Sequence, residues 1–545
     1  MVRDESTTSD RFPRRWRSDE PAAETIELVD RLRADLEAAA YTVAGVETLW
    51  DGTGEIGATH PGDALRRGHR VPAMRALDAA SGSQPALVAL VRAFLLGLPQ
   101  PARELHAALP ALGLAGAVEL GLVEVDAAGG DELARPLVDL RPYSFADAAG
   151  EGEWWIASDP GELARGDALP EDHVLGVGGA TTTLSGLLVQ TPAGRTLDLG
   201  TGSGIQALHA ARFSDRVVAT DVSERALAFA RFTARLNGVT SIEFRAGSLY
   251  EPVAGERFDR IVSNPPFVIT PRRAGVPSYE YRDGGLVGDA LVRAVLTGAV
   301  EHLRPGGVAQ FLANWEVPTG AADGAGLERV EGWLRDAGAE YWIVERELLD
   351  PSEYAETWIR DGGTRPGTGE FEALHAAWLD DFAERGVARV GFGYVLLRRP
   401  PDGAAPRMRR AERLHGPAAA NPGGLGAHLS AVLEASDLVD PLDDAELRRL
   451  VVGVAPDVTE ERHHWPGAEA PTAILLRQGG GFGRTIDAGT ALVALVGAAD
   501  GELPLGLLSD AIADLLEADG IALWSELAPQ VRALVHAGML RPVAR

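Results

Sequence analysis

The stretch Arg195–Phe267 decides the fold, because it carries three short apolar runs that each end in glycine or polar residues. It opens with RTLDLGTGSGIQALHAAR (195–212), continues through VVATDVS (217–223) and ends in DRIVSNPPF (259–267). Each apolar run has the length of a buried strand, and a helical pattern follows each of the first two runs. Strands that alternate with helices predict an α/β domain.

Glycines occupy positions 200, 202 and 204, between the first strand and the helix that follows it. Glycine readily adopts a positive φ, so it permits a tight turn and a close approach of the backbone to a ligand. Asp221 follows the second strand, where a carboxylate suits the two hydroxyls of a ribose. A turn that only closes a strand–helix unit is the alternative. The position of Asp221 favours a nucleotide-binding site.

The motif Ser263–Phe267, SNPPF, follows directly after the third apolar run. In an open α/β sheet, ligands bind just beyond the carboxyl ends of the strands. A rigid turn would also explain two consecutive prolines. The position of the motif favours a contact between a substrate and the bound nucleotide.

Taken together, DLGTGSG, TDVS and SNPPF resemble the class I S-adenosylmethionine methyltransferases that methylate planar nitrogens. This group includes release-factor glutamine, ribosomal RNA guanine and DNA adenine methyltransferases, and the resemblance covers about residues 172–400. It implies a Rossmann-like, seven-stranded sheet whose last strand is antiparallel, and S-adenosylmethionine as the cofactor. The cofactor contacts that it implies are Asp198, Gly200, Thr201, Gly202, Gly204, Asp221, Ser248, Leu249 and Asn264.

The same resemblance places the catalytic loop at Asn264, Pro265, Pro266 and Phe267. A planar NH2 group is a weak nucleophile, because its lone pair is delocalised. The Asn264 side-chain oxygen and the Pro265 carbonyl can each accept an N–H bond from it, which returns electron density to the nitrogen. Proline has no N–H and a fixed φ, so the loop is stiff. Phe267 can stack on the planar group. Catalysis then needs orientation and placed acceptors, and no strong base.

Two flanking segments are candidates for substrate contacts. The first, residues 172–190, contains His173, Thr181 and Thr182, and a glycine loop that leads into a capped helix explains it equally well. It lacks the proline- and glutamate-containing signature of the release-factor enzymes, which puts a glutamine substrate in doubt. The second segment follows SNPPF and contains Arg272 and Tyr281, which could recognise an anionic or planar substrate. A solvated basic loop is the alternative for this segment.

Changes of composition along the chain predict five segments. These are a disordered tail at 1–20, a helical, winged-helix-like accessory domain at 21–150, the methyltransferase domain at 151–400, a linker at 401–427 and a second winged-helix-like domain at 428–545. The N-terminal accessory domain could dock a macromolecular partner, whereas its acidity favours a structural lid. The locally basic run in the linker, RMRRAERLHG, is interpreted as a polar patch.

The composition excludes several classes of protein. The net charge of −28 disfavours broad binding to nucleic-acid backbones, and the absence of cysteine excludes disulfides, thiol nucleophiles and cysteine-ligated zinc. His463 and His464 have no further ligands at useful spacing, so no metal is expected. We see no secretory signal or membrane span, which predicts a cytoplasmic protein.

The sequence thus predicts an S-adenosylmethionine-dependent N-methyltransferase that modifies a planar amide or exocyclic amino nitrogen of a protein or RNA. The accessory domains favour a macromolecular acceptor, and a small-molecule acceptor stays open. The alternative from another class is a non-catalytic binding or regulatory protein that keeps this fold. The intact SNPPF motif argues against that alternative.

Overall fold

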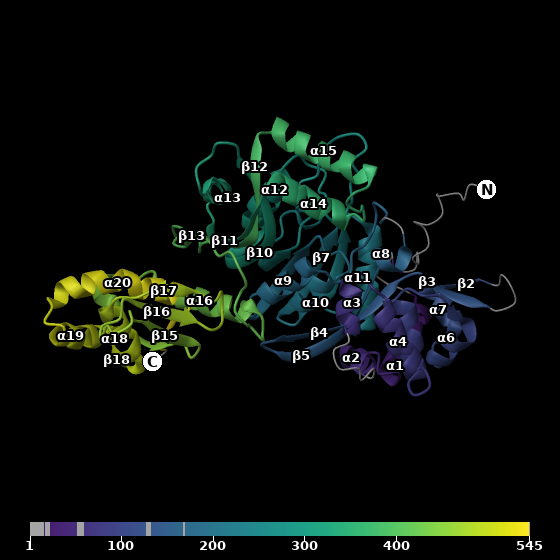
Figure 1. Ribbon diagram of the computed structural model, residues 1–545, viewed down its shortest axis with the longest axis horizontal. Helices are drawn as coiled ribbons and strands as arrows, with labels where there is room; N and C mark the ends of the chain where they lie inside the picture. The colour runs from purple at the N-terminus through teal and green to yellow at the C-terminus, as the bar shows by residue number, and fades with distance from the viewer. Residues whose placement is uncertain (1–15, 17–21, 52–58, 127–131, 167–168, 544–545) are drawn as a thin grey trace. The chain divides into compact units, whose positions relative to one another are not determined.

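The computed structural model describes residues 16, 22–51, 59–126, 132–166 and 169–543, and its central element is an eight-stranded sheet (Figure 1). The strand order is β13-β11-β12-β10-β9-β6-β7-β8. In chain order the strands are β6 (Ala193–Leu199), β7 (Ser214–Asp221), β8 (Ile242–Ala246), β9 (Phe258–Ser263), β10 (Leu303–Pro318), β11 (Glu340–Leu349), β12 (Val387–Arg398) and β13 (Arg409–Arg413).

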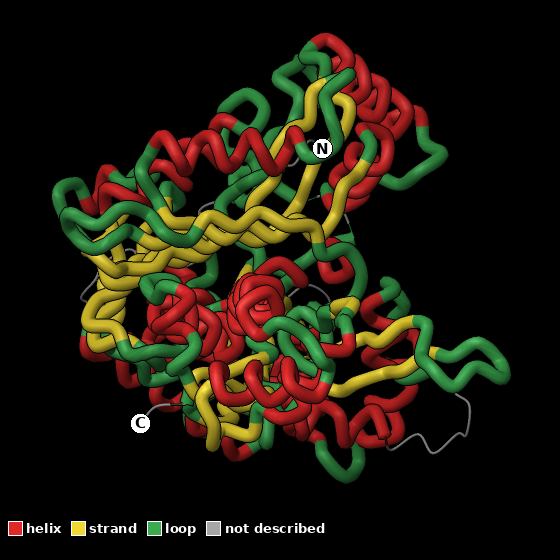
Figure 2. Tube along the Cα trace, turned by 90° about the vertical axis from the view of Figure 1, so that its left-hand side faces the viewer, coloured by secondary structure: helices red, strands yellow, loops and turns green. Residues whose placement is uncertain are grey.

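The directions of the strands agree with the predicted α/β sheet. Strands β6 to β10 pair in parallel, and β12 lies antiparallel between β10 and β11. The long strands of this sheet are strongly twisted, as Figure 2 shows in yellow. The predicted antiparallel final strand of the methyltransferase sheet, β12, is confirmed.

The predicted number of seven strands is wrong, because β13 adds an eighth strand in parallel beside β11. The sequence of β13 is polar and lies between proline- and glycine-rich stretches, so we placed it in the linker. Its pairing depends on contacts across the sheet edge. The Trp342 indole donates a hydrogen bond to Glu412, and the Arg410 guanidinium lies 4.1 Å from the centre of the Trp342 ring. By pairing with β11, strand β13 covers a sheet edge that would otherwise present unpaired backbone groups.

Helices connect the strands as the sequence predicts. Helix α11 (Glu224–Leu236) begins after Ser223, whose hydroxyl accepts a hydrogen bond from the Ala226 N–H. Two helices, α14 (Pro351–Asp361) and α15 (Gly369–Glu384), form an insertion between β11 and β12, and both pack against β12. The other helices of this part are α8 (Glu162–Arg165), α9 (Gly179–Leu187), α10 (Ile205–Ala211), α12 (Ala290–His302) and α13 (Ala325–Asp336), with a 3-10 turn, η4, at Glu251–Val253.

The N-terminal part consists of short helices and a small antiparallel sheet in the order β1-β3-β2. The two-stranded sheet of β4 and β5 follows it in the chain and precedes the eight-stranded sheet. Its elements are α1 (Ala23–Ala38), α2 (Val43–Asp51), α3 (Pro61–Arg66), α4 (Val71–Ala80), α5 (Pro85–Leu90), the π-helix η3 (Val91–Leu95), β1 (Gln100–Pro101), α6 (Ala102–Ala108), α7 (Gly113–Glu119), β2 (Val123–Asp126), β3 (Leu133–Pro136), β4 (Asp139–Asp147) and β5 (Gly150–Ser158).

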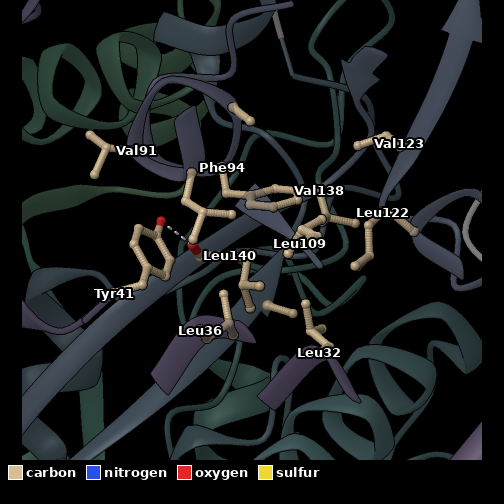
Figure 3. Packing of buried hydrophobic residues seen from close by; sticks show 14 of the residues in the cluster. Leu32, Leu36, Tyr41, Val91, Phe94, Leu109, Leu122, Val123, Val138 and Leu140 are labelled. Carbon is tan, nitrogen blue, oxygen red and sulfur yellow. Dashed lines mark hydrogen bonds between the residues drawn. The ribbon is translucent and has the colours of Figure 1, made fainter. Parts of the chain in front are cut away.

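The N-terminal helices share one hydrophobic core with α11. Figure 3 shows part of this core, where Leu32 and Leu36 of α1 face Phe94 and Leu140, and the Tyr41 hydroxyl donates a 2.7 Å hydrogen bond to the Leu140 carbonyl. The same cluster contains apolar side chains of α11, namely Ala226, Ala228, Phe229, Phe232 and Leu236. The N-terminal part is therefore packed onto the eight-stranded sheet through α11.

Polar contacts strengthen this junction. The Arg33 guanidinium of α1 donates hydrogen bonds of 2.6 Å to the carbonyls of Arg235 and Leu236, at the C-terminus of α11. A cation at this end of a helix is favourable, because the last carbonyls carry partial negative charge. The buried Trp16 ring also packs edge-on against Phe232 at a centroid distance of 5.3 Å. Apart from Trp16, the predicted tail at 1–20 lies outside the described residues.

The chain divides into two compact units. The first comprises Met1–Phe145, Glu151–Ser185 and Pro192–Arg413, and the second comprises Ala146–Gly150, Gly186–Thr191 and Leu414–Arg545. The finer predicted divisions, at residues 150, 400 and 427, stay predictions.

The C-terminal unit combines helices with two three-stranded sheets in the orders β18-β14-β19 and β15-β16-β17. The predicted helices and terminal strand are present. The elements are α16 (Leu425–Val439), α17 (Asp444–Leu447), β14 (Val451–Val454), β15 (Val458–His463), β16 (Ala473–Gln478), β17 (Thr485–Asp487), α18 (Thr490–Ala498), β18 (Asp500–Pro504), α19 (Leu505–Leu515), α20 (Gly520–His536) and β19 (Leu540–Pro542).

Membrane insertion of a helix finds no support here. Among the residues that the structure describes, no helix combines the length and apolar character needed to cross a bilayer.

Because the core is shared, a substitution that weakens the packing of α11 should also destabilise α1. Phe232→Ala should lower the free energy of unfolding by about 3–5 kcal/mol, because a fully buried aromatic ring is removed. Hydrogen exchange followed by mass spectrometry should then show faster exchange in both α11 and α1. The exposed Val71→Ala serves as the control and should change neither. Faster exchange in α11 with α1 unchanged would contradict a common core.

Candidate active site

The glycine turn after β6 has the predicted backbone geometry. Gly200, Gly202 and Gly204 have φ values of 73°, 54° and 89°, which side-chain-bearing residues rarely adopt. A Cβ atom at Gly204 would lie 3.0 Å from the Ala230 backbone of α11, whereas a Cβ at Gly200 or Gly202 would meet nothing within 4 Å. Gly204 is therefore required by packing. The other two glycines border open space that a ligand could occupy.

Asp221 joins this turn to the end of β7. One carboxylate oxygen accepts a 2.9 Å hydrogen bond from the Gly202 N–H, and the other accepts a 2.9 Å bond from the Ser223 N–H. Burial raises the pKa of Asp221, the two backbone hydrogen bonds oppose that rise, and the nearby Glu280 adds to it. Each carboxylate oxygen can accept a second hydrogen bond. Asp221 thus fixes the turn and keeps acceptor capacity for a donor such as a ribose hydroxyl.

Asp198 is the buried carboxylate at the base of the same turn. One oxygen accepts a 2.6 Å hydrogen bond from the Thr201 hydroxyl, and the other, Oδ1, has no hydrogen-bond partner. Burial raises the pKa of Asp198 to about 7, and the charge of Asp221 adds to this effect. A buried acceptor without a partner costs free energy, so this atom suits a cationic or N–H-bearing ligand.

The segment after β8 contributes a strained residue beside the turn. The Gly247 N–H donates a 3.0 Å hydrogen bond to the Asp221 carbonyl, which ties the ends of β8 and β7 together. Leu249 has a φ of 47°, in the left-handed region that costs about 1–3 kcal/mol for such a side chain. Ser248 is exposed and Leu249 is half-buried. Both residues directly follow Gly247, which is tied to Asp221, and their contact with a bound nucleotide stays a prediction.

The SNPPF loop and the glycine turn leave the sheet side by side. Asp198 of β6 pairs in parallel with Val262 of β9, so Gly200 and Asn264 both lie two residues beyond the same register position. The Ser263 hydroxyl donates a 2.6 Å hydrogen bond to the Leu199 carbonyl and locks this alignment. The buried Oδ1 atom of Asn264 has no hydrogen-bond partner. An acceptor therefore stands unpaired next to the turn.

The Phe267 side chain is buried and packs against other aromatic rings. Only 7% of its surface is exposed, and its ring packs against Phe392 at 5.6 Å and against Trp358 at 6.1 Å. Pro265 is buried and Pro266 is half-buried. Tyr354 of the helical insertion anchors the chain just after the loop. Its hydroxyl accepts a 3.0 Å hydrogen bond from the Ile269 N–H. Little of the Phe267 ring is therefore free for the predicted stacking.

The arginines of the loop after SNPPF form ion pairs with carboxylates. Arg272 forms an ion pair with the buried Asp283, and Arg273 pairs with Glu384. The buried Arg282 pairs with Asp361 at 2.7 Å. Arg272 therefore already has a carboxylate partner, and its contact with a substrate stays a prediction.

Tyr281 is also engaged. Its hydroxyl donates a 2.9 Å hydrogen bond to the Asp361 carboxylate, and its ring lies 5.9 Å from the imidazole of His173. Burial raises the pKa of the Tyr281 hydroxyl above its ordinary range. The hydroxyl and the ring of Tyr281 both have partners within the protein, and its contact with a substrate stays a prediction.

The segment before β6 is a loop that leads into α9, as one of the two interpretations predicted. His173 is buried, its Nδ1 atom has no hydrogen-bond partner, and burial lowers its pKa. Thr182 is exposed, whereas Thr181 is buried and its carbonyl accepts a 2.8 Å bond from the Gln206 side chain of α10. Of these residues, only His173 faces the Tyr281 side of the candidate site.

Several buried polar residues that position the site were missed in the sequence. Asp159 accepts a 2.8 Å hydrogen bond from the Val174 N–H and pairs with Arg225 of α11, so it fixes the loop that carries His173. Asp283 accepts bonds from Arg272, from the Ser278 hydroxyl at 2.8 Å and from the Gly285 N–H at 3.0 Å. No sequence motif marks these aspartates, because their partners come from tertiary structure.

No described group of three or more histidine or acidic side chains could hold a metal ion. His463 and His464 are both exposed.

Comparison with known families assigns two segments. Residues 176–338 match the model of the methyltransferase small domain, and residues 38–134 match a domain of unknown function, DUF7059. The first segment contains the glycine turn, Asp221 and the SNPPF motif. The resemblance to S-adenosylmethionine methyltransferases is therefore confirmed for this part of the chain.

Curated relatives match over the same region. The chain is 40% identical over 130 residues to the release factor glutamine methyltransferase of Xylella fastidiosa, which covers 22% of this chain and 47% of the relative. It is 30% identical over 203 residues to the ribosomal RNA small subunit methyltransferase C of Erwinia tasmaniensis, covering 36% and 52%. The chain thus spans about half the length of these relatives.

Solved structures resemble the chain weakly. A methyltransferase from Thiobacillus denitrificans in complex with S-adenosyl-L-homocysteine is 19% identical, with a TM-score of 0.25, and covers 41% of this chain and 91% of its own. At this TM-score the likeness carries no conclusion of its own.

The raised pKa of Asp198 predicts a pH-dependent stability. The unfolded carboxyl ionises near 3.8, but the folded one keeps its proton up to about pH 7, so the folded state binds more protons between these values. The free energy of unfolding therefore falls as the pH rises through this window. Between pH 5 and pH 8, the free energy of unfolding should therefore fall by about 3 kcal/mol less in Asp198→Asn than in the wild type.

Urea unfolding of the ligand-free protein at the two pH values measures this difference. Asp215→Asn, an exposed aspartate at the other end of β7, is the matched control and should leave the pH dependence of the wild type intact. Identical pH dependence in wild type and Asp198→Asn would show that Asp198 ionises normally.

Proposed function

We propose that this chain, whose residues 176–338 are a methyltransferase small domain, is an S-adenosylmethionine-dependent N-methyltransferase. Its acceptor is a planar amide or exocyclic amino nitrogen of a protein or RNA. The observation that carries this proposal is the unpartnered, buried oxygen of Asn264 beside an open glycine turn.

The residues at the turn fit S-adenosylmethionine. Gly200 and Gly202 border open space, Asp198 Oδ1 is an unpaired buried acceptor for an ammonium group, and Asp221 retains acceptor capacity for ribose hydroxyls. Thr201, Ser248 and Leu249 complete the proposed contacts. When bound, S-adenosylmethionine supplies an electrophilic methyl group on a sulfonium.

Asn264 would act on the acceptor nitrogen. Its Oδ1 atom and the Pro265 carbonyl can each accept one N–H bond of a planar amino group, which localises the lone pair on nitrogen and fixes its direction. The stiff prolines and the Tyr354 hydroxyl bond behind the loop keep these acceptors in place. The rate enhancement would come from orientation and preorganised acceptors, so a strong base is not required.

The chemistry of the acceptor loop favours an uncharged acceptor group. Arg272, Arg273 and Arg282 already neutralise carboxylates, so the loop offers an anionic group none of these cations. Tyr281 and His173 provide aromatic surface beside the loop. A protein amide or an unpaired base fits this surface, and the net charge of −28 weighs against a large RNA.

The accessory parts have a proposed role in holding the acceptor molecule. The order of helices, β1 and the β2–β3 pair in residues 21–150 supports a winged-helix-like module, and so does the order α18, β18, α19, α20 and β19 in residues 428–545. Because the N-terminal helices share a core with α11, we assign that module a structural role beside the cofactor site. The proposed localisation is cytoplasmic.

Asn264→Ala tests the catalytic assignment. Turnover should fall about 100- to 1000-fold, as for the loss of one preorganised hydrogen-bonding group, while the affinity for S-adenosylhomocysteine stays within a few-fold. Transfer of a labelled methyl group from S-adenosylmethionine into fractionated lysate measures turnover and identifies the acceptor class, and calorimetry measures affinity.

Ser248→Ala is the comparison variant for this test, because it lies on the cofactor side of the site and should change affinity more than turnover. Normal turnover of Asn264→Ala at saturating cofactor would contradict the assigned role. Label found only in the small-molecule fraction would overturn the macromolecular acceptor.

Gly202→Ala tests the cofactor site. The new methyl group would enter the open space of the turn, so the dissociation constant of S-adenosylhomocysteine should rise at least about tenfold, with a strain cost of about 1–2 kcal/mol. Gly255→Ala is a matched control, since Gly255 also has a positive φ (78°) and open surroundings but lies before β9. Equal affinities of the two variants would place the cofactor elsewhere.

A further inference from the structure

The outer face of α19 carries an apolar stripe that faces solvent. Leu507, Ala511 and Leu515 lie at i, i+4 and i+8, so they align along one side of the helix, and all three are exposed. The opposite side of the same helix, with Leu505, Leu508 and Ile512 among its residues, is buried in the core of the C-terminal unit. Helix α19 is therefore apolar on both faces, and only one of them is buried within the unit.

The turn between α19 and α20 extends this stripe. Leu515 and Ile521 are 83% and 82% exposed, the highest values among the large apolar side chains that the structure describes, and Leu516 is 44% exposed. Glu517 has a φ of 51°, a strained conformation in which glycine would be usual, and it makes the turn tight. We refer to Leu507, Ala511, Leu515, Leu516 and Ile521 as the α19 patch.

Acidic residues surround the α19 patch. Asp514 and Glu517 are exposed beside it, and Asp510 pairs with Arg448 at 2.7 Å. The sequence from Thr485 to Val531 has no arginine, lysine or histidine, and its carboxylates are Asp487, Asp500, Glu502, Asp510, Asp514, Glu517, Asp519 and Glu526. An exposed apolar surface with an acidic border is typical of a protein-binding site.

We propose that the α19 patch docks a basic, amphipathic segment of a partner protein. The apolar side chains of such a segment would cover Leu507, Leu515 and Ile521, and its lysines or arginines would meet Asp514 and Glu517. Charge complementarity would steer the encounter, and removal of the leucines from water would stabilise the complex. The proposal is independent of methyl transfer, because none of these residues lies in the proposed catalytic unit.

Charge also argues against two other occupants. A nucleic acid would bring phosphates to a surface that carries carboxylates and, within this segment, no cation. A second copy of the chain, docked by the same patch, would set Asp514 and Glu517 against identical carboxylates, and like charges in contact are unfavourable. A basic protein segment satisfies both the apolar and the charged parts of the patch.

The test uses the full-length protein and a fluorescent synthetic peptide of leucine, alanine and lysine, long enough for about four helical turns, with leucines along one face. Its scrambled isomer, with the same charge and no apolar face, is the peptide control. Fluorescence anisotropy measures both dissociation constants. We expect the amphipathic peptide to bind at least about tenfold more tightly than its isomer, and its affinity to fall with added salt.

Two sets of variants locate the binding site. Leu515→Ser with Ile521→Ser, and separately Asp514→Asn with Glu517→Gln, should each weaken binding at least about tenfold. Trp465→Ser, which alters a 71% exposed side chain elsewhere in the same unit, should bind like the wild type. Because all five side chains are exposed, the variants should keep the circular dichroism and melting temperature of the wild type.

Three outcomes would overturn the proposal. The first is equal binding of the peptide by the wild type and the Leu515→Ser, Ile521→Ser variant, and the second is equal binding of the two peptides. The third is a wild-type dimer in sedimentation that this double variant dissociates, which would assign the patch to a second copy of the chain. Loss of methyl transfer with intact peptide binding would affect the proposed function alone.

Discussion

The position of β6 between β7 and β9 is the constraint on which the candidate site depends. Parallel pairing on both sides of β6 brings the carboxyl ends of the three strands to one edge of the sheet. Two side-chain hydrogen bonds then fix the chain beyond the strands, from the Gly202 N–H to Asp221 and from the Ser263 hydroxyl to the Leu199 carbonyl. A change of register in this triplet would separate the glycine turn from Asn264.

The same edge collects polar atoms that the fold itself leaves unsatisfied. Asp198 Oδ1 and Asn264 Oδ1 are buried without partners, and Leu249 has a strained backbone. Each of these features destabilises the folded protein by an amount on the order of 1–3 kcal/mol. Backbone strain of the kind seen at Leu249 clusters where ligands bind. The packing of α11 against both the sheet and the N-terminal helices stabilises the region that carries them.

The two units differ in the charge of the surfaces discussed above. Around the SNPPF loop, each of the three arginines is matched by a carboxylate, and the Tyr281 and His173 rings pack together. On α19, by contrast, the carboxylates outnumber the cations and border exposed leucines. A neutral, oriented acceptor group at one place and a basic partner segment at the other are consistent with these two surfaces.

By itself, the sequence determined the strands β6, β7 and β9, the glycine turn, the place of Asp221 and the location of the SNPPF loop. These features are local, since a positive φ favours glycine and a buried strand requires a short apolar run. Only the tertiary structure decided the pairing of Arg272 with Asp283 and of Arg282 with Asp361, the burial of Phe267 and the attachment of β13 to β11. The hydrophobic core that the N-terminal helices share with α11 was also not predicted from the sequence. The partners in these contacts are distant along the chain or carry no local pattern, and pairing energies depend on which groups the fold brings together.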